Sequence, residues 1–279
     1  MKITKQRKID IGSRIAGARK DCLKTQAEVA ENLDVTFQAV SLWERGESLP
    51  DTENLINLAD LLEVSVSALV EDRGPYVFET HDKIFDWEHM VTFVKHTAKA
   101  YGMRNTTKAL PFAIKAHEGQ YRKKSNIPYI YHPLNLACHC FALDIRDDAI
   151  VAACLLHDTV EDCGCTYADL PVDDETKELV RLMTHEKDDD KRDKILRDYY
   201  KGLASNPKAA FIKCLDRCNN LTTMSWGLNR GRIYWYIRET EKYIPALLKV
   251  IKNEPEFNNA AWLLQYQIES MLDIYKRLM

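Results

Sequence analysis

A histidine and three carboxylates stand together just after the most apolar stretch of the chain. His157 and Asp158 follow the run Ala149-Ile-Val-Ala-Ala-Cys-Leu-Leu156, and Glu161 and Asp162 come one helical turn later. If helical spacing persists, an i,i+4 relation joins His157 to Glu161 and Asp158 to Asp162. Charged groups at the end of an apolar helix are costly unless they are paired or bind a metal. The stretch therefore predicts a paired or metal-binding group of side chains at the end of a buried helix.

Two further stretches place residues of the same types beside apolar ones. Asp216 and Arg217 follow Phe211-Ile-Lys-Cys-Leu, and His132 lies in Pro128-Tyr-Ile-Tyr-His-Pro133. Taken singly, each has a plain structural explanation. His132 fits an interior histidine beside a proline, and Asp216 with Arg217 fits a buried ion pair.

In this order and spacing, the motifs together resemble the HD-type hydrolase domain of the RelA/SpoT alarmone enzymes, over about residues 110–250. The resemblance implies that four side chains hold a Mn²⁺ ion. Imidazole and carboxylate ligands suit Mn²⁺ or a similar divalent ion better than thiolates would. The segments that carry the match are 116–123, 128–133, 155–162 and 213–220, and the implied ligands are His132, His157, Asp158 and Asp216.

The same resemblance implies a reaction. Glu161 and Asp162 are expected to position and deprotonate a water that the metal has acidified, so that hydroxide attacks a phosphorus atom. The implied substrate is (p)ppGpp, guanosine 3′-diphosphate 5′-di- or triphosphate, which yields GDP or GTP and pyrophosphate. Cationic side chains at the nucleotide offset phosphate charge or stack on a base. The residues that match family positions at the nucleotide are Arg122, Lys123, Asn220 and Tyr243.

Two departures from the family pattern leave the choice of nucleotide open. Asn219 stands where the family commonly has histidine, and Cys163-Gly-Cys165 replaces a polar loop. A 3′-pyrophosphate on an adenosine alarmone or a tRNA end, or the 2′-phosphate of NADPH, is an alternative substrate. The domain is also compatible with an alarmone-sensing regulator, or with an antitoxin that acts on a toxin partner. With 279 residues the chain has no room for the synthetase domain of the long enzymes, so we expect a hydrolase only.

The N-terminal segment predicts three short helices. They cover Ile11 to Cys22, the residues after Thr25 to Leu33, and the residues after Thr36 up to Gly46. Thr25 and Glu28 have the spacing of a capping box. The tight link Asp34-Val35 between the second and third helices is typical of a helix-turn-helix.

The pattern from Thr25-Gln26 to Pro50, which includes Val40-Ser-Leu-Trp-Glu-Arg-Gly46, resembles the Cro/C1-type (XRE) helix-turn-helix family. The resemblance covers about 60 residues and implies that the third helix faces the major groove of a DNA operator. Glutamine can read adenine there, and serine can donate or accept. A homodimer is expected because one such domain reads only a short half-site. The residues implied at the groove are Thr36, Phe37, Gln38, Ala39 and Ser41.

Charge supports DNA binding only locally. Residues 1–24 hold eight basic and two acidic side chains, an arm that could follow phosphates. Residues 1–73, however, hold 10 basic and 13 acidic side chains, and the whole chain has a formal charge of −3. Bulk charge therefore predicts a weak non-specific binder, and a role in protein interaction stays open for this domain.

The remaining composition is that of an ordinary globular protein, with 46% apolar and 29% charged residues. The start of the chain lacks the apolar segment of a secretory signal, and no run is long enough to span a membrane. We therefore expect a cytoplasmic protein that does not enter a membrane. The eight cysteines are expected to be reduced thiols in the core or loops.

These observations predict an all-α protein with a small helix-turn-helix domain followed by an all-helical HD-type phosphohydrolase domain. Arg73-Gly74-Pro75 marks the boundary. We expect domains at 1–72 and 101–279, joined by a connecting segment at 73–100. His185 has no partner at ligand spacing, so a surface or core role is expected for it.

Overall fold

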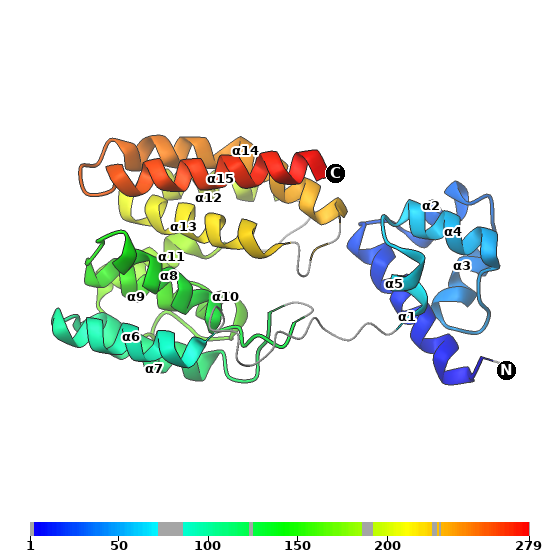
Figure 1. Cartoon of the computed structure of the whole chain (residues 1–279), viewed down its shortest axis with the longest axis horizontal. Helices are drawn as coiled ribbons and strands as arrows, with labels where there is room; N and C mark the ends of the chain where they lie inside the picture. Colours follow the sequence, from blue (N-terminus) through cyan, green and yellow to red (C-terminus); the bar gives the residue numbers. More distant parts are fainter. Residues whose placement is uncertain are drawn as a thin grey trace. The chain divides into compact units, whose positions relative to one another are not determined.

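The computed structural model describes residues 3–71, 86–122, 125–185, 192–224, 228 and 230–278. Regular structure in these ranges is helical throughout, apart from one isolated bridge between Tyr121 and Pro128 (Figure 1). The predicted all-α class is therefore confirmed. The chain divides into two compact units, one of residues 1–76 with 227–236 and the other of residues 77–226 with 237–279.

The first unit is built from helices that begin at clear N-capping residues. The predicted capping box is present, since the Thr25 hydroxyl accepts from the Glu28 amide and the Glu28 carboxylate accepts from the Thr25 amide. The first helix is longer than predicted because Thr4 caps it seven residues before the first buried apolar side chain, Ile11. The helices are α1 (Lys5–Asp21), α2 (Gln26–Asn32), α3 (Phe37–Glu44), α4 (Thr52–Leu61) and α5 (Val66–Val70).

A small apolar core holds these five helices together. Its best-buried side chains include Ile15, Val40 and Leu58, each at most 1% exposed. Helix α1 lies directly against the end of α3, because Gly12 has no side chain. A Cβ at Gly12 would lie only 2.4 Å from the Trp43 carbonyl oxygen. The glycine therefore sets how closely the two backbones approach.

The second unit contains ten helices among its described residues, one of which begins in the residues 230–236 that group with the first unit. Figure 1 shows α6 and α7 at one side of this unit, α8 and α9 next to them, and α14 and α15 at the other side. Residues 87–100, expected to connect the domains, form α6 and pack on α7 and α8 within this unit. The helices are α6 (Trp87–Ala100), α7 (Arg104–Ala116), α8 (Tyr131–Ala142), α9 (Asp148–Leu156), α10 (Thr159–Asp162), α11 (Asp174–Met183), α12 (Arg192–Ala204), α13 (Pro207–Thr223), α14 (Arg230–Lys252) and α15 (Asn258–Leu278).

Helix α9 is the central element of this unit. All eight residues from 149 to 156 are buried, and the helix packs against α7, α8 and α11. A helix that is apolar on every face must be surrounded, which explains why this run carries no polar stripe. The helix ends at His157, so the side chains that follow emerge directly from the core.

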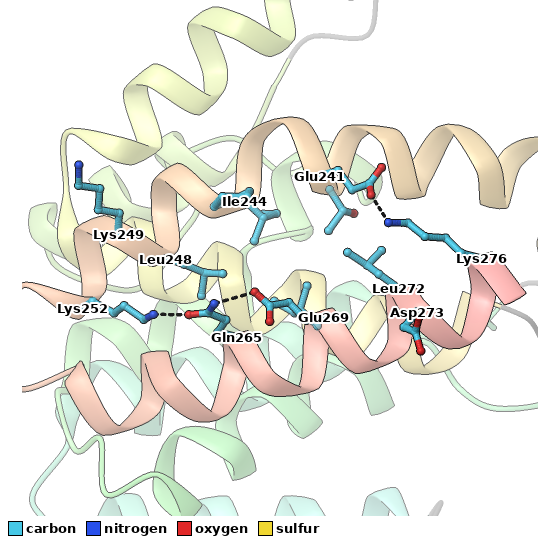
Figure 2. A pocket seen from close by; sticks show the side chains of 13 residues that line it. Glu241, Ile244, Leu248, Lys249, Lys252, Gln265, Glu269, Leu272, Asp273 and Lys276 are labelled. Atoms are coloured by element: carbon cyan, nitrogen blue, oxygen red, sulfur yellow. Dashed lines mark hydrogen bonds and ion pairs between the residues drawn. The ribbon is translucent and has the colours of Figure 1, made fainter.

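A cavity of about 590 Å³ lies between α14 and α15. Figure 2 shows its apolar floor, which includes Leu248 and Leu272, and its paired polar rim. Glu241 pairs with Lys276 there, and Gln265 donates to Glu269 at 2.6 Å. None of the predicted ligands or substrate-binding residues lines this cavity, although Ile244, next to Tyr243 in the sequence, does. The cavity is therefore not the predicted site.

Two further findings bear on the expectations from composition. No helix in the ranges that the structure describes is both long and apolar enough to cross a membrane. All eight cysteines are among the described residues and none forms a disulfide there, and Cys140, Cys154, Cys214 and Cys218 are buried.

Candidate metal centre

The structure brings the four predicted metal ligands to one point from separate helices. His132 is in the first turn of α8, His157 ends α9, Asp158 precedes α10, and Asp216 is in the middle of α13. The Nε2 atom of His132 lies 3.2 Å from Asp216 Oδ1 and 3.8 Å from Asp158 Oδ2. The Nε2 atom of His157 lies 3.1 Å from Asp158 Oδ2 and 3.9 Å from Asp216 Oδ1. Two imidazoles and two carboxylates therefore face one another.

The two histidines are held with their Nε2 atoms toward this point. His132 Nδ1 lies 2.6 Å from Asn219 Oδ1, and His157 Nδ1 lies 2.8 Å from the Cys154 carbonyl oxygen. Both partners are acceptors, so each Nδ1 carries the hydrogen and each Nε2 presents a lone pair when the ring is neutral. Such hydrogen bonds orient metal-binding histidines. Asn219, a departure from the family pattern, therefore supports a ligand.

The donor set fits a divalent cation. His132, His157 and Asp158 offer ligand atoms within 4.8 Å of one another. His157 Nε2 is buried and has no hydrogen bond of good geometry among the described residues. A buried polar atom without a partner is costly, and a cation between the imidazoles and carboxylates would satisfy it. The residues present can therefore hold the ion that the resemblance implies.

The electrostatics show how closely the group is coupled. Burial lowers the pKa of His157, but the carboxylates of Asp158 and Asp216 outweigh burial and raise it to about 9. Burial raises the pKa of Asp216, but the Lys213 ammonium at 2.9 Å and the two histidines bring it well below its usual range. Burial lowers the pKa of His132. The two carboxylates therefore favour a positive charge on His157, and Lys213 adds a second positive charge beside Asp216.

Tyr129 and His117 complete the wall beside Asp158. The Tyr129 hydroxyl donates to Asp158 Oδ2 at 2.8 Å, and its pKa is raised by burial and by that carboxylate. The Tyr129 ring lies 4.9 Å from the ring of His117, whose Nδ1 lies 2.8 Å from Gln120 Oε1. Tyr129 was not predicted as a site residue, because a single tyrosine between apolar residues gives no periodic or charge signal.

The predicted acidic pair lies on the short helix α10. Helical spacing does not run unbroken from His157, since α9 ends there and α10 begins at Thr159. The amide of Asp162 nevertheless donates to the Asp158 carbonyl oxygen at 2.8 Å, so the i,i+4 relation of that pair is kept. Glu161 is half-buried and Asp162 is exposed.

Of the predicted substrate-binding residues, two lie together near the ligands. Arg122 Nη2 donates to Asn220 Oδ1 at 3.3 Å and to Thr223 Oγ1 at 2.7 Å. Asn220 in turn donates to Asp216 Oδ1 at 2.6 Å. The guanidinium group also lies 5.6 Å from the centre of the Tyr129 ring. The Arg122 guanidinium is therefore linked through the Asn220 side chain to the carboxylate of Asp216, a predicted ligand.

The other two substrate-binding predictions have different outcomes. Lys123 lies outside the described residues. Tyr243 on α14 stacks on Tyr200, with ring centres 4.4 Å apart, and its hydroxyl is buried without a hydrogen-bond partner in the described part of the chain. Tyr200 bonds Arg217, the neighbour of a predicted ligand. The role of Tyr243 stays a prediction.

Asp216 and Arg217 do not form the ion pair that an isolated reading of the two residues favoured. Both residues lie on α13 but have different partners. Arg217 donates to Glu239 Oε1 on α14 and to the Tyr200 hydroxyl on α12, both at 2.6 Å. Arg217 is 2% exposed. The buried Arg217–Glu239 ion pair lies beside the predicted metal ligand Asp216. Together with the hydrogen bond to Tyr200 it connects α13 to α14 and α12.

The predicted DNA-contacting residues lie at the start of α3. The Thr36 hydroxyl accepts from the Ala39 amide at 3.1 Å and so caps the helix. Gln38 is exposed, Ala39 is half-buried, and the Ser41 hydroxyl accepts from Arg45. The exposed groups on this face therefore include the amide of Gln38 and the ring of Phe37, which is 50% exposed.

Comparisons with known proteins agree with both units. Residues 15–69 match the helix-turn-helix family and residues 109–229 match the HD domain family. The guanosine-3′,5′-bis(diphosphate) 3′-pyrophosphohydrolase of Aquifex aeolicus is 31% identical over 159 residues, which are 53% of this chain and 22% of that protein. The enzyme of the same name, MESH1, from Xenopus tropicalis is 28% identical over 148 residues, 52% of this chain and 81% of that protein.

The first unit has a relative of its own. The cryptic phage CTXphi transcriptional repressor RstR of Vibrio cholerae is 41% identical over 59 residues, which are 21% of this chain and 53% of that protein. The chain thus spans about a fifth of the Aquifex protein and about half of the repressor. The chain carries a helix-turn-helix domain at residues 15–69 and an HD domain at residues 109–229.

Proposed function

We propose that the second unit hydrolyses the 3′-pyrophosphate of (p)ppGpp in a Mn²⁺-dependent reaction that yields GDP or GTP and pyrophosphate. The observation that carries the proposal is the convergence of His132, His157, Asp158 and Asp216, with both Nε2 atoms facing the two carboxylates. The activity for which the Aquifex and Xenopus relatives are named supports the choice of substrate.

Different residues of the chain would hold the metal ion and orient its ligands. The four converging side chains would hold the ion, which supplies positive charge against the phosphates and lowers the pKa of a water. Asn219 and the Cys154 carbonyl keep the histidines oriented. Tyr129 fixes one oxygen of Asp158 by its hydrogen bond.

Proton transfer and substrate binding fall to residues around this group. Glu161 and Asp162 take the proton of the attacking water as its oxygen bonds to the phosphorus on the 3′ oxygen. The bond from that phosphorus to the 3′ oxygen breaks, and the 3′ oxygen leaves with the proton that the acidic pair has taken from the water. Arg122 and Asn220, which share a hydrogen bond, would bind a phosphate, and Lys123 and Tyr243 would bind the nucleotide, as the resemblance implies.

Release of pyrophosphate from ppGpp by the purified full chain with added Mn²⁺ tests the proposal. We expect turnover in the wild type, none in Asp158→Asn or His157→Ala, and retained metal with lost turnover in Glu161→Ala. Equal turnover in His157→Ala would overturn the assignment of the site. A panel of ppApp, pyrophosphorylated tRNA and NADPH is run in parallel. A wild type that binds metal and cleaves only one of these has the site but a different substrate.

We also propose that the first unit binds a DNA operator, as a homodimer. The exposed side chains at the start of α3 and the family match support this, together with the similarity to a transcriptional repressor. Gln38→Ala should weaken binding to the operator more than to unrelated DNA. Operator binding that changes with ppGpp would favour a sensing regulator. Neutralisation of a toxin that synthesises the alarmone would favour the antitoxin form of the proposal.

A further inference from the structure

His185 lies beside the predicted base Glu161, although the two residues are far apart in the sequence. It directly follows α11 and its C-cap Thr184, and its Nδ1 atom lies 3.5 Å from Glu161 Oε2. Its side chain is 30% exposed and that of Glu161 is 17% exposed. The sequence offers no spacing that links them, so only the fold brings this histidine to the site.

The nitrogen that faces Glu161 is buried and forms no hydrogen bond of good geometry in the described part of the chain. An ionised carboxylate only accepts hydrogen bonds, so this nitrogen can serve it only when Nδ1 carries the hydrogen. Hydrogen bonds in catalytic sites are often long before the substrate binds and shorten in the complex. The 3.5 Å separation is within reach of such a bond after a small rotation of either side chain.

The His185 ring is held in place by Tyr199. The two rings are stacked, with centres 4.8 Å apart and planes at 28°. The Tyr199 hydroxyl donates to the Met183 carbonyl oxygen at 2.9 Å, which ties α12 to the end of α11. The Lys213 ammonium lies 5.5 Å from the centre of the Tyr199 ring and 2.9 Å from Asp216. The histidine therefore belongs to the same packed group as a metal ligand.

Glu161 lies on an element that does not itself fix its carboxylate. It lies on a helix of four residues that has no side-chain cap, because Asp158, at the N-cap position, uses its carboxylate elsewhere. A glutamate side chain has several rotatable bonds, and fixing them costs conformational entropy unless a neighbour holds the carboxylate.

We propose that His185 is a positioning residue for Glu161. Its Nδ1–H holds one carboxylate oxygen and thereby directs the other toward the attacking water. The inference rests on the proposed hydrolysis, in which Glu161 takes the proton.

Two substitutions separate the hydrogen bond from the packing. His185→Phe keeps a ring on Tyr199 and removes the donor, whereas His185→Asn places an amide N–H near the position of Nδ1 and removes the ring. We expect His185→Phe to lower kcat by about 10- to 100-fold with KM within about twofold, because misplacing a reacting group costs rates of this order. His185→Asn should retain more of the kcat. If His185 only packs on Tyr199, His185→Phe should retain more of the kcat than His185→Asn. That order would overturn the proposal.

The ring nitrogens give a second readout that needs no turnover. In ¹⁵N spectra of the full chain, His185 should show a hydrogen on Nδ1, and Glu161→Ala should shift this signal. His139, which lies on α8 away from α10, serves as the control signal and should not move. An Nδ1 without hydrogen, or a spectrum unchanged by Glu161→Ala, would overturn the inference. If the wild type cleaves none of the substrates, the proposed function is rejected. The spectrum then still tests whether His185 Nδ1 donates to Glu161.

Discussion

The two units use the same kinds of polar residue for different purposes. In the first unit every helix begins at a threonine, serine or aspartate whose side chain accepts from the backbone three residues on. Around the metal centre, α8 and α10 have no side-chain cap, and Asp158 turns its carboxylate to His157 and Tyr129. The polar residues at these helix starts in the first unit thus stabilise local structure, whereas Asp158 at the start of α10 serves the candidate site.

The difference extends to long-range support. Helix α7 has no cap of its own, and the amides of Asn105 and Thr106 are bonded instead by the carboxylate of Asp148 on α9, each at 2.8 Å. For α7, a tertiary partner therefore does what a neighbouring residue does for the helices of the first unit. Substitutions at the buried charges should accordingly cost much more than substitutions at the caps.

The largest loss of stability should come from breaking the buried pair beside the metal centre. Arg217→Met leaves the Glu239 carboxylate without the guanidinium that bonds it at 2.6 Å, in side chains only 2% and 18% exposed. Removing one partner of a buried ion pair costs about 3–5 kcal/mol. Hydrogen exchange of peptides from α13 and α14 across a urea series measures this change.

A double substitution is the control for this result. Arg217→Met with Glu239→Gln removes the unpaired charge, so it should unfold at a higher urea concentration than Arg217→Met alone. If the single and double variants unfold together, the cost comes from lost packing rather than from the buried carboxylate, and the contrast between the units weakens.

The same contrast decides what could be predicted from the sequence. Local signals predicted the all-α class and the capping box of Thr25 and Glu28, because these depend on residues three or four apart. The motif resemblance predicted a site of four side chains that the structure does bring together, and their role as metal ligands stays a prediction.

Support that comes from distant residues could not be predicted in this way. Asn219 bonds His132 across 87 positions, and His185 approaches Glu161 from the end of another helix. Lys213 is three residues before Asp216, but only the fold shows that it is buried against that carboxylate. Such contacts have no period in the sequence, and they are set by how the helices pack.

In the first unit, the largest effect should come from backbone packing rather than from charge. In Gly12→Ala the added Cβ would lie 2.4 Å from the Trp43 carbonyl oxygen and 2.7 Å from that of Glu44. Overpacking costs about 1–3 kcal/mol. Fluorescence of the buried Trp43, combined with hydrogen exchange in α1 and α3, reports the loss.

Gly17 on the same helix is the matched control. Its added Cβ would meet nothing within 4 Å, so Gly17→Ala should raise stability by about 0.5–1 kcal/mol through helix propensity. Equal effects of the two substitutions would show that α1 does not approach α3 as the structure has it.

A single cap should matter less than either of these. Thr25→Ala removes the hydroxyl that accepts from the Glu28 amide at 3.2 Å, at a cost of about 1 kcal/mol. Thr25→Ser keeps the hydroxyl and should stay within a few tenths of a kcal/mol of the wild type. Hydrogen exchange in α2 measures both, and a loss in Thr25→Ser as large as in Thr25→Ala would assign the effect to the methyl group.

The smallest effect is a difference in acid sensitivity that follows from Glu239. Burial raises the pKa of this carboxyl, but Arg217 and the hydrogen bonds from Arg217 and Tyr200 outweigh burial and lower it below its ordinary value. A carboxyl whose pKa is lower in the folded state stabilises the fold above its unfolded pKa, and this contribution is lost as the pH falls through the folded value. The free energy of unfolding of the second unit should therefore decline below about pH 4.5, near the ordinary glutamate pKa.

In Glu239→Gln that decline should be shallower, as measured by urea unfolding at pH 5, 4 and 3. An equal decline in both proteins would mean that other carboxylates of the buried group set the acid limit.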